Sequence, residues 1–154
     1  MYPDQDSFES FLSLSVSVTG FDRVDLLGTG LAQEYYEQVV NAAGRTISNE
    51  LWAVVQNLPR RTQNELETAI RQDLLSSPKF GPIVRNIIQL WYEGTWNGLP
   101  QTWRNQYGVN PQDFTHITST AAYQQGLVWK TMSSHPDGAK QPGFGSWSLK
   151  PARK

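Results

Sequence analysis

The sequence predicts an all-α fold: a compact domain of about five to six helices with a long aromatic loop and an irregular Pro/Gly-rich C-terminal arm. Apolar residues recur at spacings of three and four over most of the first 92 positions, as on one face of a helix. Helix caps and stops separate these runs. The chain, at 154 residues, is long enough for one domain with its own core. We divide this single domain (1–154) into a helical core, 6–92, a structured loop, 93–118, a C-terminal helix, 119–134, and an extended docking arm, 135–154.

The first apolar run predicts a helix between a cap at Asp6 or Ser7 and a stop at Gly20. Its buried face would comprise Phe8, Phe11, Leu12, Ser15 and Val16. A β-strand over 12–18 is the alternative, because residues there alternate between apolar and polar with a period of two.

A second helix is predicted from an N-cap at Asp22 to about Asn41. Gly28 and Gly30 weaken its first turns, and Gly44 follows it as a stop. The apolar stripe of this helix would comprise Val24, Leu27, Leu31, Tyr35 and Val39.

Two shorter helices follow. We expect one over 48–58, capped by Ser48 and stopped by Pro59. The sequence Thr62-Gln63-Asn64-Glu65 then has the form of a capping box, so a further helix should run to about Leu75.

The fifth helix should begin near Ser77 and Pro78. It is the most hydrophobic one, so we expect it to be central. Its apolar residues are Phe80, Ile83, Val84, Ile87, Ile88, Leu90 and Trp91. From 94 to 118 the composition changes to Gly, Pro, Asn, Gln and Trp, which predicts a long structured loop.

Composition excludes several classes of function. A formal charge of -1 and a pI near 6.1 argue against a nucleic-acid partner. With no cysteine, the chain has no disulfide, thiol nucleophile or Cys-based metal site. The N-terminus has neither a twin-arginine signal nor a basic region before a long apolar run, and no apolar stretch approaches the roughly 20 residues that span a bilayer. We therefore expect no direct membrane insertion.

The candidate binding motifs are weak. Gly28-Thr29-Gly30 resembles part of a dinucleotide loop, but Gln33 stands where the third glycine belongs. His116 and His135 are far apart and lie in no metal-binding frame, so each is interpreted as a surface or loop-tethering residue. We expect no cofactor and no metal in this chain.

Catalytic groups are also not evident. Glu67 and Arg71 are four residues apart in the favourable order for a solvated ion pair on a helix. No G-x-S-x-G motif presents a serine nucleophile. These patterns predict a protein that is not an enzyme by itself.

The aromatic content is unusual, with six Trp, six Tyr and six Phe, many of them late in the chain. One interpretation is that they fill the core, and another is that they form a partner surface, where Trp and Tyr dominate binding energy. Stacking on carbohydrate is a third. Our candidate partner-binding residues are Trp91, Tyr92, Trp96, Tyr123, Trp129, Phe144 and Trp147.

Four sequence segments carry a resemblance to a known family. They are Phe11-Leu12-x-Leu14-Ser15-x-x-Val18-Thr19-Gly20, Trp91-Tyr92-x-Gly94-Thr95-Trp96, Ala122-Tyr123-x-x-Gly126-Leu127-Val128-Trp129, and Pro136-x-Gly138-Ala139-Lys140-x-Pro142-Gly143-Phe144-Gly145-x-Trp147. Together they resemble the small (gamma) subunit of membrane-bound FAD-dependent sugar and polyol dehydrogenases, such as the D-sorbitol, fructose, glucose and gluconate dehydrogenase complexes.

The resemblance implies a non-catalytic subunit that supports folding, stability or export of a large FAD-containing subunit. It also implies FAD in that partner and haem c in a multihaem cytochrome c subunit. By resemblance the location would be periplasmic, at the membrane through partners; the alternative is cytoplasmic. A free-standing helical module that binds a protein or a sugar is the alternative function.

Overall fold

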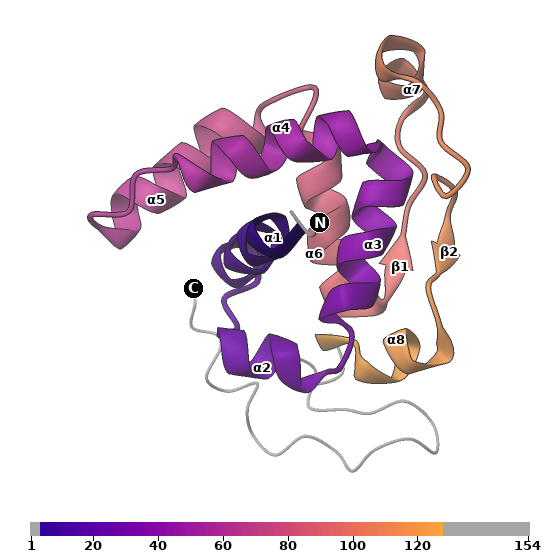
Figure 1. The fold of residues 1–154 in the computed structure, drawn as a ribbon, viewed down its shortest axis with the longest axis horizontal. Helices are drawn as coiled ribbons and strands as arrows, with labels where there is room; N and C mark the ends of the chain where they lie inside the picture. The colour runs from indigo at the N-terminus through magenta and orange to yellow at the C-terminus, as the bar shows by residue number, and fades with distance from the viewer. Residues whose placement is uncertain (1–3, 128–154) are drawn as a thin grey trace.

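The computed structural model describes residues 4–127, which form a helical domain with one small two-stranded antiparallel sheet (Figure 1). Of the described residues, 69% are helical and 3% lie in strands, which confirms the predicted all-α class. The elements of the described region are α1 (Asp4–Thr19), α2 (Arg23–Gly28), α3 (Ala32–Ala43), α4 (Arg45–Gln56), α5 (Gln63–Ala69), the π-helix η1 (Ile70–Leu75), α6 (Gly81–Glu93), β1 (Thr95–Trp96), α7 (Gln101–Tyr107), β2 (His116–Ile117) and α8 (Thr120–Gln125).

Helix α6 is central, as its hydrophobicity predicted, and packs against α1, α3, η1, β1 and α8. Its apolar residues Ile83, Ile87 and Leu90 are completely buried. The helix begins at Gly81 and not near Ser77. The Ser77 hydroxyl accepts hydrogen bonds from the amides of Lys79 and Phe80, and these bonds hold a turn before the helix. This helix thus provides the surface on which the other elements pack.

The first predicted helix is confirmed as α1, but it begins at Asp4, so the predicted cap at Asp6 or Ser7 is wrong. The alternative strand over 12–18 is also wrong. Phe11, Leu12 and Leu14 are buried. The serines in this helix satisfy their hydroxyls locally: Ser15 Oγ donates to the Phe11 carbonyl at 2.8 Å. A serine-rich sequence can therefore be buried as a helix without losing hydrogen bonds.

The long second helix predicted from Asp22 to Asn41 is two helices, α2 and α3. Gly30, with φ +75°, turns the chain between them, and the Thr29 hydroxyl accepts from the Leu31 amide at 3.1 Å. The N-cap at Asp22 is confirmed. The predicted apolar stripe is wrong at Val24 and Leu27, because the break turns their side chains toward solvent.

Helix α4 begins at Arg45, one turn before the predicted cap. Gly44, with φ +95°, supplies the helix start, and Ser48 lies inside the helix with 1% of its surface exposed. The prediction of Ser48 as a cap is therefore wrong.

The predicted N-cap of α5 is confirmed: Thr62 Oγ1 accepts from the Glu65 amide at 3.0 Å. The Glu65 carboxylate pairs with Arg61 at 2.9 Å. The helix continues to Leu75 as predicted, with its last six residues in the π-helix η1.

The predicted loop over 93–118 contains secondary structure of its own. Strand β1 pairs antiparallel with β2, with Thr95 opposite Ile117, and α7 lies between the two strands in sequence. Gly94 takes the left-handed conformation that ends α6, and a Cβ there would lie 2.7 Å from the Ala122 carbonyl carbon. This close approach brings α8 against the end of α6.

Helix α8 is capped by Ser119 and ends at Gln125, shorter than the helix predicted over 119–134. Gly126 changes the chain direction, and a Cβ on it would lie 2.6 Å from the Tyr92 carbonyl oxygen. The rest of that prediction, together with the docking arm 135–154, lies outside the described residues.

We expect Tyr35→Phe to reduce the loss of stability at alkaline pH. Burial raises the pKa of Tyr35, and the nearby Glu34 charge adds to the effect. The unfolded tyrosine ionises near pH 10 while the folded one keeps its proton, so folding stability should fall as the pH rises above about 10. Within the described chain the hydroxyl has no hydrogen-bond partner. At neutral pH the substitution should therefore cost less than about 1 kcal/mol.

Urea unfolding of both proteins at about pH 8 and about pH 11 would measure this difference. Tyr123→Phe, at a tyrosine that is 42% exposed, is the matched control. Equal pH dependence in the two variants would contradict the assignment to Tyr35.

Candidate partner-binding surface

Trp91 lies in the core, with 1% of its surface exposed. Its ring meets Tyr35 edge-on with centroids 4.9 Å apart, and stacks on Phe11 at 6.2 Å. The interpretation of Trp91 as a partner-binding residue is therefore corrected: in the folded domain it packs three helices together, and its surface is already covered.

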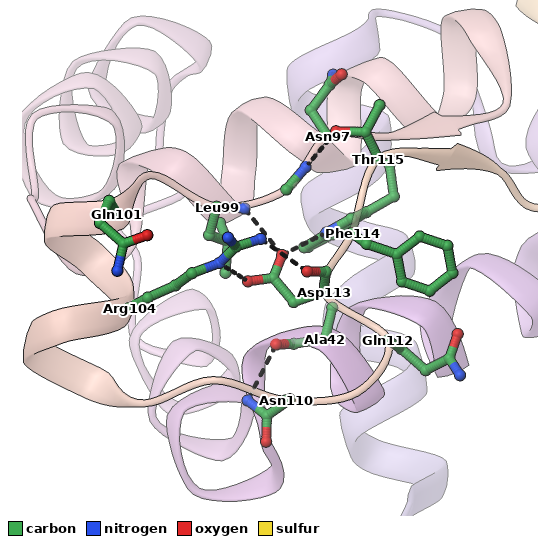
Figure 2. A network of polar contacts seen from close by, with 12 residues as sticks. Ala42, Asn97, Leu99, Gln101, Arg104, Asn110, Gln112, Asp113, Phe114 and Thr115 are labelled. Carbon is green, nitrogen blue, oxygen red and sulfur yellow. Dashed lines mark hydrogen bonds and ion pairs between the residues drawn. The ribbon is translucent and has the colours of Figure 1, made fainter.

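Trp96 is also completely buried, and its indole N–H donates to Asp113 Oδ1 at 2.9 Å. The same oxygen accepts from the Leu99 amide at 2.8 Å, and Arg104 Nε donates to the other carboxylate oxygen at 3.0 Å. Figure 2 shows Arg104 and Asp113 pointing toward each other inside the loop. Trp96 is thus a structural residue of this network and not a surface anchor.

The Asp113 network was missed by sequence reasoning, although a signal for it was present. Arg104 and Asp113 are the only Lys, Arg, Asp or Glu residues between 94 and 118. A lone pair of opposite charges in an otherwise neutral, Trp-containing segment favours a buried ion pair, because a buried charge needs a partner. The Asp113 side chain is fully buried and that of Arg104 is 25% exposed.

Side-chain amides attach this loop to the helices. Asn86, on α6, donates to the Asn97 carbonyl at 2.9 Å and accepts from the Asn97 amide at 2.7 Å. Gln38, on α3, donates to the Gln112 carbonyl at 3.0 Å. The loop is therefore part of the folded domain and fixes the positions of β2 and α8.

Tyr92 is half-buried and joins α6 to the end of α1 and to the connection between α1 and α2. Its hydroxyl donates to the Thr19 carbonyl at 3.2 Å, and its ring meets Phe21 edge-on at 6.2 Å. Tyr123, on α8, is 42% exposed. Three other candidates, Trp129, Phe144 and Trp147, lie outside the described residues, so their role as anchors stays a prediction.

The structure reveals exposed apolar side chains that the sequence did not indicate. On α2, Val24 is 77% exposed and Leu27 is 42% exposed. Helices α2 and α8 lie at the same end of the molecule (Figure 1), and a recess of about 210 Å³ lies between them. This recess is lined by Val24, Asp25, Gly28, Thr29, Gln125, Gly126 and Leu127.

The remaining candidate groups have local structural roles. His116 stacks on Phe114 with ring centroids 4.1 Å apart, and its Nδ1 lies 2.6 Å from the Phe114 carbonyl oxygen. Glu67 accepts from Gln63 at 3.1 Å, in place of the predicted pair with Arg71. Gly28-Thr29-Gly30 lies at the break between α2 and α3, and His135 falls outside the described residues. Among residues 4–127 no group of three or more His, Asp or Glu side chains could hold a metal ion.

Comparison of the chain with protein-family models, with curated proteins and with solved structures finds no match. In the described part of the chain, no helix has both the length and the apolar character needed to cross a membrane. Function is therefore inferred from the sequence motifs and from the surface of the domain.

We expect Asp113→Ala to lower the free energy of unfolding by about 3–5 kcal/mol, because it leaves Arg104 and two buried N–H donors without their acceptor. Asp113→Asn should cost less, since an amide oxygen can still accept from Trp96 and Leu99. Urea unfolding followed by circular dichroism would measure both. The control is Asp73→Ala, at an exposed position of η1, for which a change within about 0.5 kcal/mol is expected. Similar losses of stability at the two positions would contradict a stabilising role for the Asp113 network.

Proposed function

We propose that this chain is a non-catalytic small subunit of a flavin-dependent sugar or polyol dehydrogenase, and that it supports folding, stability or export of the large FAD-containing subunit. One observation carries the proposal. The aromatic motif that resembles this family continues beyond Leu127, and Leu127 is itself buried on the domain with 1% of its surface exposed. An arm that begins at a fixed point on a folded domain can reach a partner while the domain keeps its shape.

In such a complex the chemistry belongs to the other chains. The large subunit holds FAD and oxidises the sugar, and a multihaem cytochrome c subunit with haem c takes the electrons. This chain contributes binding surface, in the periplasm and at the membrane through its partners; a cytoplasmic complex is the alternative location.

The arm carries a large part of the apolar surface that a stable interface needs. Phe144 and Trp147 would each bury about 150–250 Å² against a partner. At roughly 25 cal/mol per Å², the two side chains would contribute roughly 8–12 kcal/mol before the cost of ordering the arm is subtracted. A net micromolar to nanomolar affinity, about 8–12 kcal/mol, then also needs contacts from the domain.

Capture of the flavoprotein tests this function. Full-length tagged chain, co-expressed with a candidate large FAD subunit of the source organism, should recover a stoichiometric complex that releases flavin on denaturation and reduces a dye when sugar or polyol is added. Trp147→Ala and Phe144→Ala should each weaken capture by about tenfold or more, as hot-spot aromatics do. Phe114→Ala, at an aromatic residue that is 49% exposed on the domain, is the matched control.

Truncation after Ser134 should abolish capture and leave the helical circular dichroism spectrum unchanged. If the large subunit is recovered active and loaded with flavin when this chain is not expressed, the proposed support role is overturned. Capture that is unaffected by the truncation would instead assign the arm to the chain's own domain.

A second candidate function is a free-standing sugar-binding module. A recess of about 940 Å³ lies between α1 and α5, and its lining includes Ser13, Ser17, Gln63 and Glu67. Hydroxyl, amide and carboxylate groups are those that recognise polyols, and the volume lies within the range of small-molecule sites. Titration calorimetry with a panel of sugars and polyols would show binding that Gln63→Ala weakens if this function holds; heats equal to those of dilution would exclude it.

A further inference from the structure

A chemically labile pair of residues, Asn97 and Gly98, lies in the loop between β1 and α7. Asparagine is one of the thermolabile residues of proteins. When glycine follows it, no Cβ shields the next main-chain nitrogen, and that nitrogen can attack the asparagine side chain. Asn97 is the only asparagine of the chain that precedes a glycine, and it is exposed to water. The sequence therefore makes Asn97 the most reactive asparagine of the chain.

Deamidation at this pair needs no reactant other than water. The Gly98 nitrogen loses its proton and attacks Cγ of Asn97, so that a new C–N bond closes a succinimide ring. The bond between Cγ and Nδ2 breaks, and the side-chain nitrogen leaves as ammonia. Water then hydrolyses the ring at either carbonyl. The products are aspartate, with a normal main chain, and isoaspartate, in which the main chain runs through the former side chain.

Hydrogen bonds fix the main chain on both sides of Asn97. The attacking group, the Gly98 amide, donates to Thr115 Oγ1 at 2.9 Å, and Figure 2 shows Asn97 next to Thr115. The Asn97 amide donates to Asn86 Oδ1 at 2.7 Å, and the Asn97 carbonyl accepts from Asn86 Nδ2 at 2.9 Å. Ring closure requires the Gly98 nitrogen to give up its proton and to turn toward Cγ. It therefore competes with these hydrogen bonds and is favoured when the loop opens locally.

Packing explains why glycine occupies position 98. A Cβ added there would lie 2.6 Å from Nη2 of Arg104. Arg104 is held in place because its Nε donates to Asp113 Oδ2 at 3.0 Å and its Nη2 donates to the Asp113 carbonyl at 2.7 Å. A side chain at position 98 would push against this ion pair. The Asp113 network thus requires the glycine that makes Asn97 labile.

We propose that Asn97 is a modification site of this chain, which deamidates to aspartate and isoaspartate at a rate that the contacts of Gly98 with Thr115 and of Asn97 with Asn86 keep low in the folded loop. The modification acts back on the loop. Isoaspartate adds an atom to the main chain, so the amide and carbonyl of residue 97 no longer match the two ends of the Asn86 side chain. The site belongs to this chain alone and does not depend on the proposed function.

Peptide mapping by mass spectrometry tests the site in the full-length chain. After incubation at mildly alkaline pH, trypsin releases the peptide 86–104, in which fragmentation assigns the replacement of NH₂ by OH to one residue. Asn97 should deamidate at least about tenfold more slowly in the folded chain than in a synthetic peptide of the same sequence, because only local opening frees the Gly98 amide. In urea the rate should rise to that of the peptide. Equal rates in the folded chain and the peptide would overturn the protection, and an unmodified Asn97 in urea would overturn the site.

A threonine pair tests the contact that holds the Gly98 amide. Thr115→Ala removes its acceptor and should speed deamidation at Asn97 by about threefold or more, as the loss of a hydrogen bond allows. Thr118→Ala is the matched control, because the Thr118 hydroxyl donates to Glu34 at 2.6 Å and not to the Gly98 segment. Circular dichroism would verify that both variants stay folded during the incubation. Equal rates in the two variants would contradict the role of Thr115.

Unfolding of the modified chain tests the effect on the loop. The isoaspartate form, separated by ion exchange through its added charge, should unfold at a lower urea concentration than Asn97→Asp, which carries the same charge on a normal main chain. Equal unfolding midpoints would contradict the effect on the loop. None of these measurements requires the flavoprotein, so failure here is distinguishable from failure of the capture experiment.

Discussion

The packing of Trp91 is the interaction on which the other contacts of the domain depend. Its ring lies against Tyr35 of α3 and Phe11 of α1, so a single side chain of α6 holds two other helices. Phe11 in turn meets Trp52 of α4 edge-on at 6.0 Å, which joins the fourth helix to the same cluster. Aromatic pairs in such geometry add about 0.5–1.5 kcal/mol each to the energy of burial. Losing this residue would therefore loosen four helices together.

Polar contacts hold the chain in place beyond the aliphatic and aromatic core. The segment from 94 to 118 supplies few aliphatic side chains, and its position is set by Asp113, Asn86 and the close approach of Gly94 to Ala122. A polar network of this kind is stable only when every buried member is paired, which explains why Trp96 directs its indole N–H at a carboxylate. The described candidate residues therefore differ in position: Trp91 and Trp96 are interior, Tyr92 is half-buried and Tyr123 is exposed.

Sequence reasoning succeeded where local chemistry decides the structure. The helical period of α1, the Thr62 cap and the apolar α6 each depend on residues within a few positions of one another. It failed where a contact between residues far apart in the sequence decides the structure. The apolar period through Val24 and Leu27 continues across a helix break, and no local signal tells which neighbour, if any, covers them. The Gln38 contact with Gln112 joins residues 74 positions apart, so no local pattern could have indicated it.

The position of α2 depends on apolar burial more than on charge. A helix of six residues does not persist alone, so α2 depends on its tertiary contacts. Arg23 donates two hydrogen bonds to Glu9, at 2.6 and 3.0 Å, and this lowers the pKa of Glu9. Both side chains are largely exposed, so solvent screens the ion pair and its contribution to stability is small. Leu26 of α2 is completely buried, and burying a leucine side chain contributes about 1.5–3 kcal/mol. The burial of Leu26 therefore outweighs the ion pair in fixing α2.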